Sequence, residues 1–192
     1  LNKTTAQITA LEWYNEGVKL KSEKKYIAAY DAFKKVVSIA PSYKQGWYEL
    51  GWVCNERGQY DESVTAIKKL LLLDSVHQQG YFELGYAYQK KDLKEEAIST
   101  FNKLLALNKN FSSAWKNLGE LYRSKSEFAK SLQSYTQYLQ LKPNNYEVLY
   151  NLGYTCNMAE RYTEAIDWMA KALLVKKTAD VYNEIGFAYF KL

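Results

Sequence analysis

Residues 81–101 read YFELGYAYQKKDLKEEAISTF, and this arrangement of large, small and glycine residues recurs along the chain. Tyr81, Leu84 and Gly85 stand close together, a small residue follows at Ala97, and a large one follows at Phe101. The glycine returns every 34 residues, with a last interval of 33. A fixed period of this length indicates one supersecondary unit copied in tandem, so the chain is an array of repeats. The recurring glycines are Gly17, Gly51, Gly85, Gly119, Gly153 and Gly186.

Each repeat can be numbered so that its glycine is position 8. Large residues then recur at positions 4, 7, 11 and 24, and small residues at position 20. These spacings place one stripe on a first helix and another on a second helix. Because a mid-helix glycine costs about 1 kcal/mol relative to alanine, we expect it to face the small residue and let the two helices touch. We expect Asp61, Asp92 and Ser126, in the turns between the helices, to favour the start of the second helix.

The pattern of a large residue, Leu and Gly, followed by a small residue and an aromatic, resembles the tetratricopeptide repeat family. Pro41 and Pro143 fill the family's proline position, whereas Ser75, Lys109 and Lys177 depart from it. The resemblance implies an all-α, right-handed superhelical solenoid of antiparallel helix pairs, with five repeats and the first helix of a sixth. We expect an N-terminal extension at residues 1–9 and a solenoid at 10–192, with repeats at about 10–43, 44–77, 78–111, 112–145 and 146–178, and a partial repeat at 179–192.

The composition limits the classes of protein to which the chain can belong. With 192 residues, 47% hydrophobic and 16% aromatic, the chain can bury a sizeable core. No apolar run approaches the roughly 20 residues that would span a bilayer, so we expect no membrane span. Cys54 and Cys156 share the buried position 11 and are expected to be small core residues rather than disulfide partners. We expect a cytoplasmic protein, and two buried thiols leave a periplasmic or otherwise exported one open.

The resemblance implies that the first helices line a concave groove and that positions 2, 5, 6, 9, 12 and 13 face into it. Aromatic residues are frequent there, and Tyr and Trp are enriched at binding hot spots. We therefore expect these rings to contact a peptide, although rings that only stack to stiffen the groove are the alternative. The candidate groove residues are Tyr14, Tyr48, Glu49, Trp52, Phe82, Glu83, Tyr86, Lys116, Glu120, Tyr150, Asn151 and Tyr154.

The charge of the expected groove differs from that of the chain, whose formal net charge is +5. An acidic, aromatic groove would repel phosphates, so we expect no nucleic acid and favour a peptide with basic and apolar residues. RNA binding remains an alternative, one that would require basic residues on this face. The charged residues at positions 2, 5, 6 and 9 are Glu49, Glu83, Glu120, Glu147, Asp180 and Glu184, against Lys116 alone.

Residues for catalysis are scarce. The single histidine, His77, falls in an expected surface turn, and with two distant cysteines it forms neither a metal set nor a catalytic dyad. We therefore expect no enzyme activity and no cofactor or metal. The sequence predicts a non-catalytic scaffold or adaptor that binds a peptide. A recruiting or regulatory arm of a larger enzyme or of a secretion or assembly complex, and a pure assembly element, remain open.

The two ends of the array differ. Glu16 replaces the apolar residue of position 7 only in the first repeat, as suits an end that no earlier repeat covers. The last helix is apolar on several sides, with Phe187, Phe190 and Leu192. Since such a helix favours burial, we expect either that the natural chain continues or that this helix self-associates.

Overall fold

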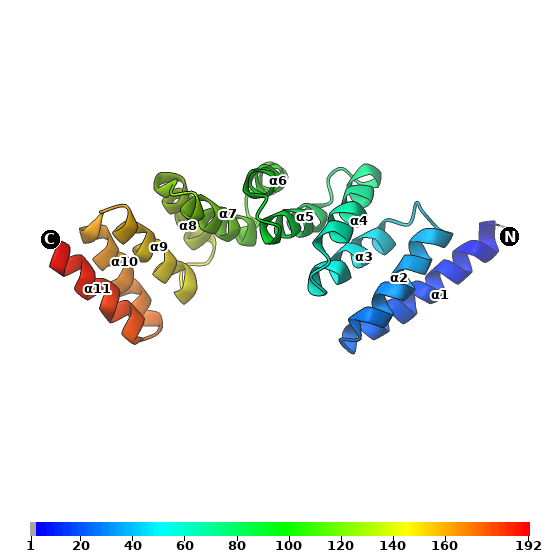
Figure 1. The fold of residues 1–192 in the computed structure, drawn as a ribbon, viewed down its shortest axis with the longest axis horizontal. Helices are drawn as coiled ribbons and strands as arrows, with labels where there is room; N and C mark the ends of the chain where they lie inside the picture. Colours follow the sequence, from blue (N-terminus) through cyan, green and yellow to red (C-terminus); the bar gives the residue numbers. More distant parts are fainter. Residues whose placement is uncertain (1–2) are drawn as a thin grey trace. The chain divides into compact units, whose positions relative to one another are not determined.

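A computed structural model describes the backbone of residues 3–192 and the side chains from Thr9 onward. Within this range all regular structure is helical, and the helices follow one another through short turns (Figure 1). The all-α array of helix pairs predicted from the period is confirmed. The helices are α1 (Lys3–Ser22), α2 (Tyr26–Ile39), α3 (Lys44–Glu56), α4 (Tyr60–Leu73), α5 (Gln78–Lys90), α6 (Lys94–Leu107), α7 (Ser112–Ser124), α8 (Phe128–Leu141), α9 (Tyr146–Met158), α10 (Tyr162–Val175) and α11 (Ala179–Lys191).

The chain forms two compact units. The first contains α1–α6 and extends to Leu107, and the second contains α7–α11 and runs from Asn108 to Leu192. Inside each unit every helix packs against the next one, and first helices of neighbouring repeats also touch, as α3 does α5 and α9 does α11. Helix α1 begins at Lys3, so residues 3–9, which the sequence analysis treats as an extension, are helical as well.

The turn between the two helices of each repeat has one repeated geometry. The residue seven positions after the periodic glycine has a positive φ, and the next backbone N–H bonds to the carbonyl five residues earlier, as Gln59 does to Cys54 at 2.8 Å. This hydrogen bond closes a Schellman-type helix end. The sequence expectation for the turn is therefore corrected: Asp92 and Ser126 hold the left-handed position, and Asp61 lies in the first turn of α4 without capping it. The left-handed residues are Lys24, Gly58, Asp92, Ser126 and Glu160.

The periodic glycines make room for the large residue of position 24. A Cβ atom built on Gly85 would lie 2.7 Å from the ring of Phe101, and one on Gly119 would lie 2.5 Å from the ring of Tyr135. The sequence pattern predicts that the glycine faces the small residue of position 20 instead. That contact exists as well in one repeat, since the hydroxyl of Ser131 donates to the carbonyl of Gly119 at 2.7 Å. Glycine thus makes room for the large side chain of position 24, which is aromatic in three repeats, Ile67 in the second and Met169 in the fifth.

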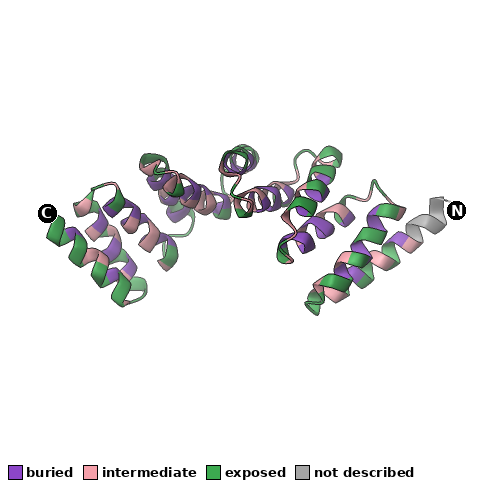
Figure 2. Cartoon of the chain, viewed as in Figure 1, coloured by how far each residue is buried: buried purple, intermediate pink, exposed green. Residues whose placement is uncertain are grey.

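Buried residues lie along the faces by which the helices of each unit contact one another (Figure 2). Cys54 and Cys156 are free thiols within this core, as predicted, and burial raises their pKa values to about 12 and about 11. None of the described helices is both long and apolar enough to cross a bilayer.

Candidate binding surface

Seven of the twelve candidate residues lie in the first compact unit, on α1, α3 and α5. Tyr14 packs against Phe33 and Tyr43, with ring centroids 6.0 Å and 5.3 Å apart. The other six define what we call the α3–α5 surface. Its rings are half-buried, so each presents part of its face to solvent, whereas its two carboxylates are largely covered. The α3–α5 surface consists of Tyr48, Glu49, Trp52, Phe82, Glu83 and Tyr86.

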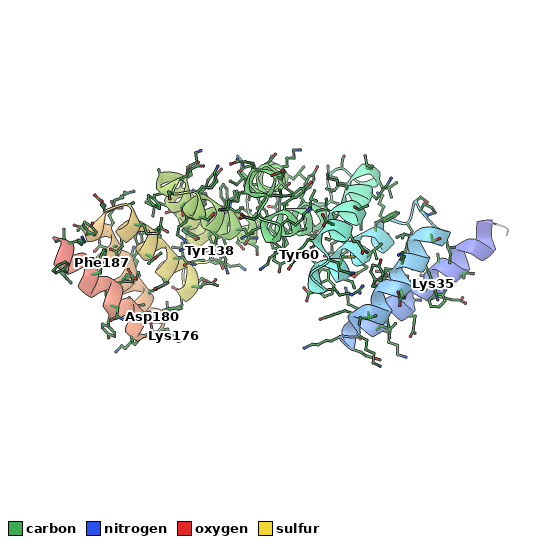
Figure 3. The ribbon with its side chains drawn as sticks, in the orientation of Figure 1. Lys35, Tyr60, Tyr138, Lys176, Asp180 and Phe187 are labelled. Atoms are coloured by element: carbon green, nitrogen blue, oxygen red, sulfur yellow. The ribbon has the colours of Figure 1, made fainter. Side chains whose placement is uncertain are left out.

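The aromatic residues of position 9 pack edge-on against the preceding second helix. Trp52 meets Tyr26 at 5.9 Å between ring centroids with the planes 73° apart, and Tyr86 meets Tyr60 at 6.4 Å and 75° (Tyr60 is labelled in Figure 3). In each pair the partner is the first residue of that second helix. These contacts orient the rings and leave them only half-buried, and each joins a ring of a first helix to a ring of a second helix.

The ammonium group of a lysine lies over each of these two rings. The Nζ atom of Lys21 lies 4.7 Å from the Trp52 ring centroid, and that of Lys90 lies 5.3 Å from the Tyr86 ring centroid. Cations at this distance are attracted by the negative face of an aromatic ring. The count of charges at positions 2, 5, 6 and 9 does not include these two bases, because Lys21 is at position 12 of α1 and Lys90 is at position 13 of α5. The surface is therefore less acidic than the sequence analysis expects.

The two acids of the α3–α5 surface connect neighbouring repeats. Glu49 is 8% exposed and pairs with Lys21 at 2.5 Å, and Glu83 is 9% exposed and accepts a hydrogen bond from the Asn55 amide at 2.7 Å. Burial raises the pKa of Glu83, the Asn55 hydrogen bond opposes the shift, and the carboxylates of Glu56 and Glu49 add to it. The sequence analysis did not identify Lys21 and Asn55 as these partners. Their shared place at position 12 is the signal that could have found them.

Tyr48 lies next to both of these acids. Burial, with the nearby charges of Glu83 and Glu49, raises the pKa of its hydroxyl to about 12. Its ring centroid is 5.2 Å from that of His77. His77 lies in the turn before α5, as the sequence predicts, and it is also the N-cap of α5, since its Nδ1 accepts the backbone N–H of Gly80 at 2.9 Å. A histidine whose Nδ1 accepts a hydrogen bond carries its proton on Nε2.

The other five candidates lie in the second compact unit, on α7 and α9. Tyr150 and Tyr154 are half-buried and stack with Tyr146 along α9, with centroids 6.3 Å and 6.2 Å apart. Arg123 lies over the Tyr154 ring at 5.5 Å. Asn151 is half-buried. The remaining two carry charge, because Lys116 pairs with Glu147 at 2.7 Å and lies 4.0 Å from Glu120.

Across the described part of the chain, no three His, Cys, Asp or Glu residues are grouped so that they could hold a metal ion. The candidate residues supply half-exposed aromatic rings, paired charges and amide groups instead. Such a surface can bind by contact and hydrogen bonding.

Comparison with known proteins shows which repeat family this arrangement is similar to. Two models described as tetratricopeptide repeat match the chain, one over residues 116–180 and the other over 45–77 and 78–111, together more than half of its length. No curated protein sequence matches.

Solved structures share the fold over most of the chain. A crystal structure of MamA is 26% identical with a TM-score of 0.83, and the alignment covers 88% of this chain and 92% of MamA. MamA of Desulfovibrio magneticus RS-1 is 17% identical with a TM-score of 0.83, covering 90% and 97%. YrrB, described as a TPR protein with an unusual peptide-binding site, is 19% identical with a TM-score of 0.75, covering 99% and 97%. The solved structures share the fold, and the two family models, which together match more than half of the chain, show that the chain belongs to the tetratricopeptide repeat family.

Proposed function

We propose that the chain is a non-catalytic interaction module that binds a peptide segment of a partner protein on the α3–α5 surface. Apolar side chains of the peptide would contact Tyr48, Trp52, Phe82 and Tyr86, and a lysine or arginine would lie beside Glu83. The observation that carries the proposal is the set of half-exposed rings on two adjacent first helices, because large rings with a polar tip dominate the energetics of protein interfaces. The likeness to YrrB supports a peptide as the ligand.

The basic residue in the proposed peptide follows from the local charges. Glu49, Glu56 and Glu83 lie close enough together for the first two to raise the pKa of the third. Asn55 donates to one oxygen of Glu83, and a carboxylate has capacity for further donors. Lys21, which pairs with Glu49, already lowers the pKa of Glu83, and a further cation placed there would offset the remaining like charge.

The test uses peptides selected by phage display on the full chain. We expect the selected peptides to carry apolar residues next to lysine or arginine. Trp52→Ala and Tyr86→Ala should each weaken binding by more than about 2 kcal/mol, roughly thirtyfold in Kd. Tyr30→Ala, a ring on α2 outside the surface, is the control and should bind like the unchanged chain. Equal binding by all three variants would reject the assignment.

The other compact unit could contribute through Lys116, Glu120, Tyr150, Asn151 and Tyr154, and the same titration with Tyr150→Ala measures that contribution. A role as a recruiting arm of an enzyme or of a secretion or assembly complex would use the same surfaces. Self-association would use a different one: Tyr182, Phe187, Tyr189 and Phe190 of α11 are exposed (Phe187 is labelled in Figure 3), and light scattering over a range of protein concentrations tests it.

A further inference from the structure

A hydrogen bond from position 4 to an earlier carbonyl recurs in three repeats. The indole N–H of Trp47 donates to the carbonyl of Pro41 at 2.8 Å, and that of Trp115 donates to the carbonyl of Lys109 at 2.8 Å. The hydroxyl of Tyr81 donates to the carbonyl of Ser75 at 3.2 Å. In each case the donor lies six residues after the acceptor. The ring thus closes the space beneath the loop that leads into its own helix.

The fifth repeat breaks this pattern. Position 4 is Leu149, which has no polar group, and no described residue donates to the carbonyl of Pro143, six residues earlier. A pocket of about 660 Å³ lies at this place, between α8, α9 and α10. Its lining includes Leu139, Pro143, Leu149, Trp168, Lys171 and Leu174.

The corresponding grooves in the first compact unit are smaller and do not extend to the residue whose carbonyl accepts the hydrogen bond from position 4. One of about 530 Å³ lies over Tyr81, and one of about 260 Å³ lies over Trp47. Neither is lined by the acceptor residue, Ser75 or Pro41, because the position 4 ring already occupies that contact. The larger pocket therefore coincides with the replacement of an aromatic residue by leucine.

The chemistry of the pocket wall is also particular to the fifth repeat. Trp168 occupies position 23, where the other repeats have Ala, Thr or Ser, and its indole N–H makes no hydrogen bond to the described residues. The Nζ atom of Lys171 lies 3.7 Å from the Trp168 ring centroid. Lys171 is the one charged residue among those lining the pocket, and within residues 9–192 it has no carboxylate partner.

We propose that this pocket accepts a tryptophan or tyrosine side chain of a partner polypeptide that carries an acidic residue next to it. The incoming ring packs on Leu149 and Trp168 and donates its N–H or O–H to the Pro143 carbonyl, which reproduces the bond that Trp47, Tyr81 and Trp115 make internally. The neighbouring carboxylate pairs with Lys171, whose charge nothing else on the pocket wall balances. An acidic partner also suits the net charge of +5 of the chain.

This site is separate from the proposed peptide surface. Leu149 and Tyr150 are consecutive residues of α9, and consecutive side chains of a helix point about 100° apart. The pocket lies in the second compact unit and shares no residue with the α3–α5 surface, which lies in the first.

The experiment titrates the full chain with N-acetyl-Glu-Trp-amide and follows the Trp168 indole resonance by ¹H–¹⁵N NMR, assigned with Trp168→Phe. Two matched probes are N-acetyl-Lys-Trp-amide, with the opposite charge, and N-acetyl-Glu-Leu-amide, without a donor or a ring. We expect each to bind about fivefold more weakly or worse, the effect of losing one net polar interaction. Equal binding of the three probes would overturn the proposal.

The variant Leu149→Trp places the residue of the second and fourth repeats into the pocket, so it should fold and abolish binding of N-acetyl-Glu-Trp-amide. Lys171→Glu changes an exposed side chain and should weaken that binding about fivefold or more while N-acetyl-Lys-Trp-amide gains. Trp52→Ala, in the other compact unit, should leave the binding of N-acetyl-Glu-Trp-amide unchanged. Failure of the pocket proposal can therefore be told apart from failure of the proposed peptide surface, which the phage-display peptides test. Retained binding by Leu149→Trp would contradict the proposal. So would self-association that Leu149→Trp removes, because the occupant would then be a second copy.

Discussion

The side-chain amide of Asn55 donates to Glu83 twice, to its carboxylate at 2.7 Å and to its backbone carbonyl at 3.1 Å. Asn157 repeats both bonds with Glu184, at 2.8 Å and 3.1 Å. The donor is on the first helix of one repeat and the acceptor on the first helix of the next. A charged acceptor makes such hydrogen bonds stronger than neutral ones. Glu83, which is proposed to meet a ligand, therefore also holds two adjacent repeats together.

The substitution Glu83→Gln tests the structural role and the ligand-binding role of Glu83 separately, and the structural role is read from the pH dependence of stability. Burial raises the pKa of Glu83 above its ordinary value of 4.5, so the folded chain holds a proton on it more tightly than the unfolded chain. Its contribution to stability is therefore largest at low pH and is lost as the pH rises through the raised pKa. Glutamine accepts the Asn55 bond without a charge, so the variant should be more stable than the unchanged chain near pH 7. That difference should shrink below pH 4.5.

Urea unfolding at both pH values measures the effect, with Glu16→Gln, on the exposed side of α1, as control. A variant that is less stable near pH 7 would show that the ionised form is the one the fold favours. The same variant should bind the selected basic peptides more weakly, since the proposed ion pair needs the charge.

The periodic glycines provide a matched pair of substitutions. At Gly119 a Cβ atom would meet the Tyr135 ring at 2.5 Å, whereas at Gly186 it would meet nothing within 4 Å. Gly119→Ala should therefore destabilise the chain by about 1–3 kcal/mol through overpacking. Gly186→Ala should stabilise α11 by up to about 1 kcal/mol, because alanine is the better helix former. Thermal unfolding followed by circular dichroism compares the two, and a loss of stability in both would mean that the ring contact is not the cause.

The serines of position 20 differ in their hydrogen bonds. Both Ser63 and Ser131 are fully buried, but only the Ser131 hydroxyl has a partner, the Gly119 carbonyl. Ser131→Ala should cost about 1 kcal/mol, the typical net value of a hydrogen bond. Ser63→Ala should be neutral or stabilising, since it removes a buried group without a partner. Chemical denaturation of the two variants tests this, and an equal loss would indicate that Ser63 is satisfied in solution.

The parts of the structure that the sequence predicts are those that repeat with a local period. The spacing of Gly17, Gly51 and the glycines after them predicts the helix pairs that the structure contains, whereas the expected contact of Trp52 and Tyr86 with a ligand stays a prediction. The partners of Glu49 and Glu83 are not predicted, because they lie on the preceding repeat and depend on how two repeats pack. The residue that fills the space over each glycine depends on the same geometry.

The turn between the two helices of a repeat shows the same limit of prediction from sequence, here for a single residue. A positive φ costs a non-glycine residue roughly 1–2 kcal/mol, yet four of the five turns carry Lys, Asp, Ser or Glu there. Composition alone would therefore not assign these positions. They become visible only when the five Schellman-type hydrogen bonds are compared.

Substitution at this left-handed position gives the last prediction. Glu160 has φ 58° and Gly58 has φ 72° at equivalent places in two repeats. Glu160→Gly should stabilise the chain by about 0.5–1 kcal/mol, because glycine adopts this conformation without strain. Gly58→Ala should destabilise it by about 1 kcal/mol, and strain is the only cause available, since a Cβ atom there would meet nothing within 4 Å. Urea unfolding of both variants checks the pair. If Glu160→Gly lowers stability, the loss of backbone freedom on folding outweighs the relief of strain, and the turn then has a different energetic basis.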